Sequence, residues 1–567
     1  MDKHAILGGI NFGRRVAEDE IVELASYFVE TDQWRRTYDG EIDIIYGPKG
    51  SGKSAIYSLL LARSRELRER GVLVVPGENL RGTPAFKDLV VDPPASQREF
   101  IGLWKLYLLS LVGRVLKDES IHGAEADRVV TELERIGLLE RSSSLASTIR
   151  SALTYVRSMM RAESMEGGVS VDPGTGLPTL SGRITFREPT AADNKAGFVS
   201  VDALLGLANA GLEKSRRAVW LLLDRLDVAF ADTVQLEQNA LGALFRVYLD
   251  SLAFDFIRLK IFLRTDIWRR VSQEGFREAS HIERTMTISW DERSLLNLIV
   301  RRLVKNPIIG EAYDVQPEQL LRVAEQQEAL FYRIFPRSIQ EHGQELSALT
   351  WMITNTSDAS QTAAPREIIH LLNDGREAQL RSLELGEAWP GDECLIGAQA
   401  LITALQGVSK VRLEQTLYAE YPELRELIRR LEGKPNRFVR QDLQQYWDRK
   451  VGPTGTLIAR LQDVGFFSAS AVERILIVPP IYAIALRIGA KRTRKHRSKK
   501  ARRPNAQTIT CAACGKTFEW QRPDTNVPPP SQCKKCRRKQ RRQEEEKARA
   551  ASAPTSAPDA SPSQPDG

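Results

Sequence analysis

An apolar run that leads into a glycine-rich loop and then into a helix-forming stretch constrains the fold of this chain most. Residues 44–46 are Ile-Ile-Tyr, and the next eight residues match G-x-x-x-x-G-K-[ST] at every fixed position. Those eight residues are Gly47, Pro48, Lys49, Gly50, Ser51, Gly52, Lys53 and Ser54. The pattern predicts a strand, a phosphate-binding loop and a helix, and therefore a domain built on a parallel α/β sheet.

Each fixed position of this loop has a role in binding a nucleoside triphosphate with Mg²⁺. Glycines let backbone N–H groups turn toward phosphate oxygens, which side chains would block. Lys53 supplies positive charge to the β and γ phosphates, and the hydroxyl of Ser54 is a ligand for Mg²⁺. The helix that follows adds the partial positive charge of its amino terminus. ATP and Mg²⁺ are therefore the expected cofactors.

A second apolar run, about 170 residues further on, ends in an acid. Residues 218–223 predict a buried strand, and Asp224 follows it directly. A carboxylate in this place can hold Mg²⁺, so we expect Asp224 to share the metal with Ser54. Many ATPases carry a glutamate next, but here Arg225 occupies that position and the next acid is Asp227. We therefore expect Asp227 to be the second acid, and hydrolysis to be slow.

Two arginines are candidates for contact with the γ-phosphate. Arg264 follows the predicted strand 259–263, at a position where related ATPases place a polar residue that senses this phosphate. Thr265 can fill the same role, and a solvated strand end accounts for Arg264 equally well. Arg366 lies in the first turn of a predicted helix with Pro365 at a favourable early position. From there it can reach the phosphates across a domain boundary.

Two Cys-x-x-Cys pairs lie near the carboxyl end of the chain. The four cysteines are Cys511, Cys514, Cys533 and Cys536, with 18 residues between the pairs. This spacing is typical of four thiolates that bind zinc in a tetrahedron at about 2.3 Å per Zn–S bond. Disulfides are the alternative, which a cytoplasmic location disfavours. Because four sulfurs close the coordination sphere, Zn²⁺ is expected to be structural.

The positive charge of the chain is concentrated around these cysteines. The net charge is +8, yet residues 490–550 alone carry 20 Lys and Arg against 5 Asp and Glu. Seven of the cations lie within or directly after the second cysteine pair, over 534–542. Together with Phe518 and Trp520, they predict contact with the phosphates of a nucleic acid and stacking on its bases. Since no base-reading pattern is visible, we expect largely sequence-independent binding, with DNA as the partner.

Location and assembly are less constrained by the sequence. No apolar run reaches the roughly 20 residues that a membrane span needs, so no membrane partner is expected. The first residues lack the charged segment and apolar segment of a secretion signal, and we expect a cytoplasmic protein. Whether copies of the chain form a homo-oligomer is left open.

Several stretches together resemble a family of bacterial P-loop ATPases related to the AAA+, origin-recognition and STAND signalling ATPases. They are Phe12-Gly13, the acidic lead-in helix, Gly47 to Ser54, residues 222–227 (Leu-Leu-Asp-Arg-Leu-Asp), residues 262–266 (Phe-Leu-Arg-Thr-Asp), residues 288–290 (Ile-Ser-Trp) and residues 365–369 (Pro-Arg-Glu-Ile-Ile). The resemblance covers roughly residues 10–375 and extends more weakly to 489.

This resemblance implies an ATP-driven switch in which Lys53, Ser54 and Asp224 bind the nucleotide and Mg²⁺. It implies that Arg264 and Arg366 occupy the sensor 1 and sensor 2 positions. A setting in bacterial defence or genome maintenance is implied by the resemblance alone. The chain differs from standard AAA+ enzymes in lacking an acid directly after Asp224, which bears on the rate of turnover.

The expected fold is an α/β P-loop NTPase core with a parallel sheet of the AAA+ or STAND type, followed by a helical and winged-helix-like region and a small four-cysteine zinc ribbon. In order, we expect a lead-in helix over 1–40, the ATPase core over 41–305 with a helical and hairpin insertion over 97–190, a helical lid over 306–394, a winged-helix-like region over 395–489, a basic linker over 490–510, the zinc ribbon and a basic helix over 511–550, and a disordered tail over 551–567.

Two functions follow from these patterns. The first is an ATP-binding and ATP-hydrolysing switch that associates with nucleic acid through the basic zinc ribbon. The second is a STAND-like signalling scaffold in which the nucleotide controls oligomerisation, turnover is small and the ribbon binds a protein. The missing acid after Asp224 favours the second. A GTPase is disfavoured, because no N-K-x-D motif appears and residues 194–197 lack the aspartate.

Overall fold

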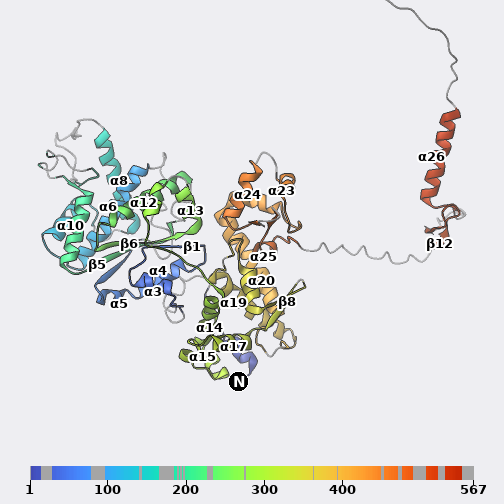
Figure 1. Cartoon of the computed structure of the whole chain (residues 1–567), viewed down its shortest axis with the longest axis horizontal. Helices are drawn as coiled ribbons and strands as arrows, with labels where there is room; N and C mark the ends of the chain where they lie inside the picture. The colour runs from blue at the N-terminus through green and yellow to red at the C-terminus, as the bar shows by residue number, and fades with distance from the viewer. Residues whose placement is uncertain are drawn as a thin grey trace, which may run out of the picture. The chain divides into compact units, whose positions relative to one another are not determined.

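The structure is a computed structural model of the chain (Figure 1). It describes residues 2–14, 24, 28–77, 96–139, 144–164, 184–187, 191, 195, 198–226, 234–273, 276–341, 343–361, 363–391, 394–447, 452–469, 475–489, 506–521 and 530–551. Contacts between residues divide the chain into two compact units, Met1–Ala490 and Lys491–Gly567.

A five-stranded parallel sheet forms the core of the first unit. Its strands are β1 (Ile44–Gly47), β2 (Val72–Pro76), β5 (Ala218–Leu223), β6 (Ile257–Arg264) and β7 (Thr285–Thr287). They lie in the order β2-β5-β6-β1-β7, and every neighbouring pair is parallel. Because parallel strands end at the same edge, the residues that follow β1, β5 and β6 meet there. The expected parallel α/β core is confirmed.

Side chains of the strands alternate between two hydrophobic cores, as the two-residue period of a strand requires. In β5, Val219, Leu221 and Leu223 face one core, and Trp220 and Leu222 face the other. Strands that are apolar on both faces need helices on both sides.

Helices cover both faces of the sheet (Figure 1). One face packs against α3 (Asp32–Tyr38), α4 (Lys53–Ala62) and α5 (Ser64–Glu69). The other face packs against α6 (Gln97–Asp118), α7 (Ala124–Arg135), α8 (Leu145–Ser164), α10 (Val201–Lys214) and α12 (Val234–Ser251). The long helix α6 begins with a capping box between Ser96 and Glu99, which satisfies backbone N–H groups at its first turn.

The insertion expected over 97–190 is helical in its first part, as α6, α7 and α8 show. Its β-like pieces are described only in part. Residues 169–171 lie outside the described residues, and β3 (Ile184–Thr185) pairs in parallel with β4 (Val199–Ser200). The described strand of this insertion therefore does not belong to a hairpin within it.

A mainly helical region follows the sheet and has its own apolar core. Its helices are α14 (Glu292–Val304), α15 (Pro307–Tyr313), α16 (Pro317–Leu320), α17 (Ala324–Ile334), α18 (Ala348–Thr356), α19 (Pro365–Glu384) and α20 (Ala398–Val411). An antiparallel pair, β8 (Ser338–Glu341) and β9 (Gln344–Ser347), interrupts it, which the sequence patterns did not predict. Helix α1 (Lys3–Gly9) packs in the same core. Of the lead-in helix expected over 1–40, residues 15–23 and 25–27 lie outside the described residues.

The last part of the first unit has the order of a winged helix. It contains a π-helix (Arg412–Leu417), α21 (Tyr418–Glu420), a 3-10 turn (Pro422–Leu424), α22 (Arg425–Arg429), α23 (Arg440–Tyr446), α24 (Thr454–Asp463), β10 (Ser468–Ala469), β11 (Leu476–Ile477) and α25 (Pro480–Ala483). Strand β10 pairs antiparallel with β11. Phe438 forms an isolated antiparallel bridge with Leu476 of β11. Helices α23 and α24 directly precede this small antiparallel sheet. The winged-helix-like region over 395–489 stays a prediction.

The second unit is small. Strands β12 (Ala506–Thr510) and β13 (Thr517–Gln521) form an antiparallel pair, and α26 (Lys534–Ala551) follows. None of the helices in the described part of the chain combines the length and the apolarity that crossing a membrane takes.

Candidate nucleotide site and candidate metal centre

The glycine-rich loop joins β1 to α4, as the motif predicts. Two of its residues, Gly50 (φ 82°) and Gly52 (φ 103°), adopt left-handed backbone conformations that L side chains rarely take. A third, Gly47, is constrained by space, because a Cβ atom there would lie 2.3 Å from Ser51 Oγ. The sharp turn of the backbone therefore requires these glycines.

The two expected magnesium ligands lie side by side. Ser54, in the first turn of α4, donates a hydrogen bond of 2.8 Å from Oγ to Oδ2 of Asp224, which directly follows β5. The other carboxylate oxygen of Asp224 accepts a 2.8 Å bond from the backbone N–H of Arg225, and the side chain is only 6% exposed. A hydroxyl and a carboxylate are oxygen donors of the kind that Mg²⁺ prefers, so the pair suits this ion.

The side chain of Lys53 folds back onto the backbone of the glycine-rich loop. Lys53 Nζ donates to the carbonyl oxygens of Gly47, at 2.8 Å, and Pro48, at 3.0 Å. These bonds place a cation within the curve of the loop, where the phosphates of a triphosphate are expected.

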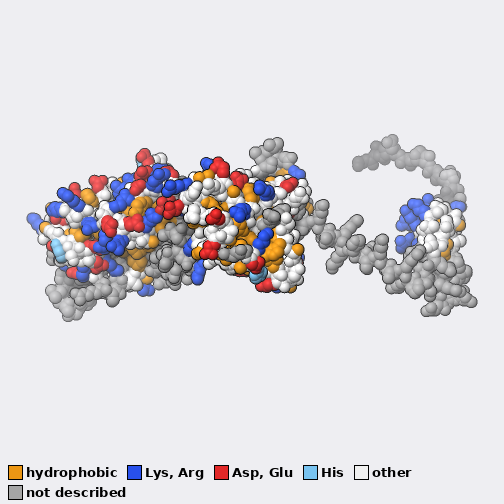
Figure 2. All heavy atoms as spheres, turned by 90° about the horizontal axis from the view of Figure 1, so that it is seen from below, with side chains coloured by type: hydrophobic (Ala, Val, Ile, Leu, Met, Phe, Trp, Pro, Cys, Tyr) orange, Lys and Arg blue, Asp and Glu red, His pale blue; other side chains and the backbone are white. Residues whose placement is uncertain are grey.

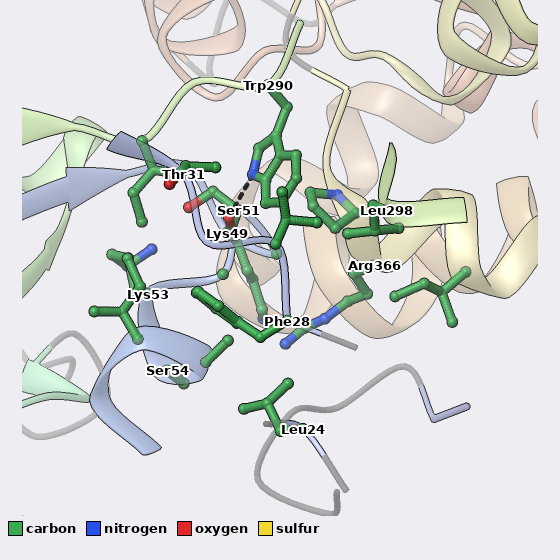
Figure 3. A pocket seen from close by; sticks show the side chains of 18 of the residues that line it. Leu24, Phe28, Thr31, Lys49, Ser51, Lys53, Ser54, Trp290, Leu298 and Arg366 are labelled. Carbon is green, nitrogen blue, oxygen red and sulfur yellow. Dashed lines mark hydrogen bonds between the residues drawn. The ribbon is translucent and has the colours of Figure 1, made fainter. Parts of the chain in front are cut away.

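A cavity of about 240 Å³ opens beside this loop (Figure 3). Seven of its described lining residues are cationic: Arg14, Lys49, Lys53, Arg225, Arg264, Arg302 and Arg366. Asp224 is the one acid among the described lining residues. Cations in such excess on a cavity wall favour a ligand with several negative charges.

Apolar side chains form a second wall of the cavity. Leu24, Phe28, Ile288, Trp290 and Leu298 contribute to it. The indole Nε1 of Trp290 donates a 2.7 Å bond to the carbonyl oxygen of Ser51, drawn as a dashed line in Figure 3. This bond fixes the ring against the loop. A mostly apolar wall beside charged groups suits a flat ring carried by a phosphate chain.

No role was predicted for Trp290 or Phe28. The Ile-Ser-Trp stretch was visible in the sequence, but nothing local indicates that its indole folds onto a loop some 240 residues earlier.

Arg366 lies where the sequence placed it, in the first turn of α19 after Pro365. A Cβ atom on Gly50 would lie 3.1 Å from Arg366 Cβ, so the helix start touches the loop. Its Nε is buried, and no acceptor for its hydrogen is found among the described residues. Arg366 is therefore suited to contact a ligand in the cavity.

Arg264 reaches the cavity but is already bound to three side chains. It forms bonds of 3.0 and 2.9 Å to the carboxylate of Asp266, 2.6 Å to Glu420 and 2.9 Å to the hydroxyl of Tyr421. Burial raises the pKa of Asp266, but the charge and hydrogen bonds of Arg264 outweigh this and hold the pKa at about 2. Glu420 and Tyr421, from α21 and the residue after it, were missed by the sequence analysis. Asp227 lies outside the described residues.

The four cysteines of the second unit come together. Their Sγ atoms all lie within 4.8 Å of one another, and Cys514 Sγ is 3.9 Å from Cys533 Sγ. Tetrahedral zinc at about 2.3 Å from each sulfur separates the sulfurs by about 3.8 Å, so the cluster fits Zn²⁺. No disulfide links them. The backbone N–H of Cys533 donates to Cys511 Sγ at 3.2 Å, a contact that favours a thiolate.

Helix α26 carries the seven cations that lie within or directly after the second cysteine pair. They are Lys534, Lys535, Arg537, Arg538, Lys539, Arg541 and Arg542, all exposed. At 100° per residue they cover an arc of about 200° on the helix, and Cys536 and Gln540 fall on the opposite side. Figure 2 shows Lys and Arg side chains gathered on this unit. Phe518 is half-buried, and the side chain of Trp520 lies outside the described residues.

The sequence matches no known protein family and no curated protein. Several solved structures are similar over most of the chain, among them the following three. The Aeropyrum pernix ORC2 protein in its ADPNP-ADP complexes is 13% identical, with 84% of this chain and 92% of that chain covered and a TM-score of 0.35. A Walker-type ATPase of Pyrococcus abyssi is 12% identical, with 81% and 96% covered and a TM-score of 0.35. The Aeropyrum pernix ORC1 protein in complex with DNA is 13% identical, with 84% and 95% covered and a TM-score of 0.34.

Because these sequence identities and TM-scores are low, the fold class is assigned from the structure of this chain alone. The sheet order and the loop between β1 and α4 define a P-loop NTPase core. A helical region and a four-cysteine cluster follow it.

Proposed function

We propose that this chain is a switch that binds and hydrolyses ATP and associates with nucleic acid, DNA in the first place, through its second unit. The observation that carries the proposal is the 2.8 Å contact between Ser54 and Asp224, beside Lys53, in a cavity lined by seven cations and one acid. A triphosphate with Mg²⁺ suits this combination of two oxygen ligands, a loop lysine and a cation-rich wall.

In this proposal each site residue has a separate role in binding or hydrolysing ATP. Ser54 and Asp224 hold Mg²⁺, which neutralises phosphate charge. Backbone N–H groups of Gly47 to Ser54 and the Lys53 ammonium bind the β and γ phosphates. Arg264 and Arg366 stabilise charge on the γ-phosphate, and Asp227 serves as the second acid.

A second candidate, the scaffold with little turnover, is favoured by Arg225. This residue stands where a catalytic acid is common and has a left-handed backbone (φ 58°), which is uncommon for arginine. A cation in this place cannot take a proton from water. Under this proposal the nucleotide controls homo-oligomerisation and the second unit binds a protein.

Nucleic-acid binding is supported by the exposed arc of cations on α26 and by the zinc-binding geometry that anchors the start of this helix. Contacts of Lys and Arg with phosphates are independent of base sequence and weaken steeply with salt. A setting in bacterial defence or genome maintenance belongs to this proposal.

The nucleotide assignment is tested by titrating a fluorescent ATP analogue with MgCl₂ into the full chain. Lys53→Ala should weaken binding at least tenfold, because it removes a charge-assisted phosphate contact. Lys117→Ala is the matched control, since Lys117 pairs with Glu134 on the surface away from the loop. Equal affinity of the parent and Lys53→Ala would contradict the assignment.

Turnover separates the two candidates. ATP hydrolysis is measured with and without DNA or RNA, together with the molecular mass in each nucleotide state. Hydrolysis that depends on Lys53 and rises with nucleic acid supports the switch. Binding without hydrolysis, accompanied by a nucleotide-dependent change of mass, supports the scaffold.

A further inference from the structure

The segment 412–421 of the winged-helix-like region touches the phosphate loop directly. Glu420, at the end of α21, forms an ion pair with Lys49 of the loop and a second one of 2.6 Å with Arg264 at the end of β6. Its side chain is 16% exposed. One carboxylate therefore binds two cations that also line the nucleotide cavity.

The same segment makes a second charged contact at the loop. Arg412, buried at the start of the π-helix, pairs with Glu367 at 2.8 Å. The other carboxylate oxygen of Glu367 lies against the loop, since a Cβ atom on Gly50 would be 3.2 Å from it. Glu367 also follows Arg366 of the cavity wall. A π-helix is a rare conformation that often occurs at functional sites.

The charge on Glu420 is fixed by its partners. Burial raises the pKa of this carboxyl, but Arg264 and Lys49 outweigh burial and hold the pKa below its ordinary value. The carboxylate is therefore ionised at neutral pH. A triphosphate in the cavity approaches Lys49 and Arg264 from the other side, and two anions that share cations repel each other.

We propose that Glu420 is a carboxylate gate that opposes triphosphate binding and that is displaced by it. This inference rests on the proposed ATP binding. Coupling between two sites is reciprocal. If the contact of Glu420 with the loop weakens ATP binding by some factor, then bound ATP weakens the contact of 412–421 with the loop by the same factor. The bound nucleotide thereby reaches the winged-helix-like region through a named side chain.

The first test is the affinity of the full chain for the fluorescent ATP analogue with MgCl₂. Glu420→Gln keeps the shape and removes the charge, and the Kd should fall about five- to tenfold, within the usual range of coupling. Glu423→Gln is the control, because Glu423 pairs with Arg460 on the surface and also loses one charge. A Kd for Glu420→Gln that equals or exceeds that of the parent overturns the gate.

The second test is hydrogen exchange of peptides that cover 412–421, with and without ATP. In the parent, ATP should speed exchange in this segment, and in Glu420→Gln exchange should already be fast without ATP. Exchange in the parent that ATP leaves unchanged or slows overturns the proposal.

Failure of the gate and failure of the proposed function give different results. If the parent binds no ATP, the proposed function fails and the gate fails with it. If the parent binds ATP in a manner that depends on Lys53 while Glu420→Gln behaves like the parent, the gate alone fails.

Discussion

The two units of this chain are stabilised in different ways. The first has three apolar cores, two against the faces of the sheet and one in the helical region. In the second, Cys511 is the only buried side chain among the residues that the structure describes. A unit that buries so little apolar surface is commonly stabilised by a bound metal. The first unit also contains a cavity that suits a small ligand, whereas the described part of the second unit presents exposed cations beside a cluster of four cysteines.

Removal of zinc should have the largest effect, because it should unfold the second unit and leave the first unit folded. A chelator, or Cys511→Ser with Cys514→Ser, should unfold β12, β13 and the start of α26, because four thiolates replace an apolar core there. Hydrogen exchange should rise over 506–551 and stay unchanged in β5.

Cys394→Ser is the control for that experiment, since Cys394 is a buried cysteine of the first unit. Persistent protection of β12 and β13 in the metal-free chain would show that the second unit does not depend on zinc.

The second largest effect is expected when cations on α26 are neutralised. Lys534→Gln, Arg537→Gln, Arg538→Gln and Arg541→Gln together should weaken DNA binding about 10²- to 10³-fold at 100 mM salt and reduce the slope of log K against log salt by up to about 3.6. Binding is measured over a salt series, with Gln540→Ala as the uncharged control. ATP affinity should stay the same, because the nucleotide cavity lies in the first unit. An unchanged salt slope would place the nucleic-acid contacts elsewhere.

A buried ion pair lets the stability of the first unit be tested by itself. Lys260 and Asp43 are 0% and 4% exposed, with Nζ and Oδ1 2.9 Å apart, and Arg284 also contacts Asp43. Asp43→Asn leaves the buried Lys260 without a counter-charge and should lower the free energy of unfolding by about 3 kcal/mol. The loss is limited because burial already lowers the pKa of Lys260 to about 8, so the lysine can give up its proton.

Urea unfolding measures this effect. Asp39→Asn is the matched control, since Asp39 pairs with Arg70 on the surface and should cost under about 1 kcal/mol. Equal costs for the two variants would mean that the buried pair adds nothing to the first unit.

Local patterns predicted the parts of the sites that are local in the chain. The loop from Gly47 to Ser54 and the cysteine pairs of the ribbon are each fixed by spacing, because one turn or one knuckle brings the groups together. The position of Asp224 beside Ser54 could be predicted, because an acid directly after a buried strand commonly lies next to the phosphate loop in such a sheet. The strands themselves were visible as apolar runs.

Contacts between distant segments could not be predicted in this way. Glu420 reads as a polar residue of an amphipathic helix, and only the packing of the winged-helix-like region brings it to Lys49 and Arg264. Lys260 interrupts an apolar strand, a pattern typical of a strand edge. It is nevertheless fully buried, because Asp43, directly before the neighbouring strand β1, supplies the opposite charge. Such pairings depend on which strands and helices become neighbours in the fold, and local patterns in a single sequence do not predict those neighbours.

The smallest effect expected concerns Trp290, whose ring is held against the phosphate loop by one hydrogen bond. Trp290→Phe keeps an apolar ring but removes the 2.7 Å bond to Ser51, a change of about 1 kcal/mol, and should raise the Kd for ATP about fivefold. Trp351→Phe is the matched control, since it removes a 2.8 Å indole bond to Glu341 away from the cavity and should leave the Kd unchanged. If both variants bind ATP like the parent, the indole does not position the loop. If both weaken binding equally, the effect of Trp290 comes from stability rather than from contact with the loop.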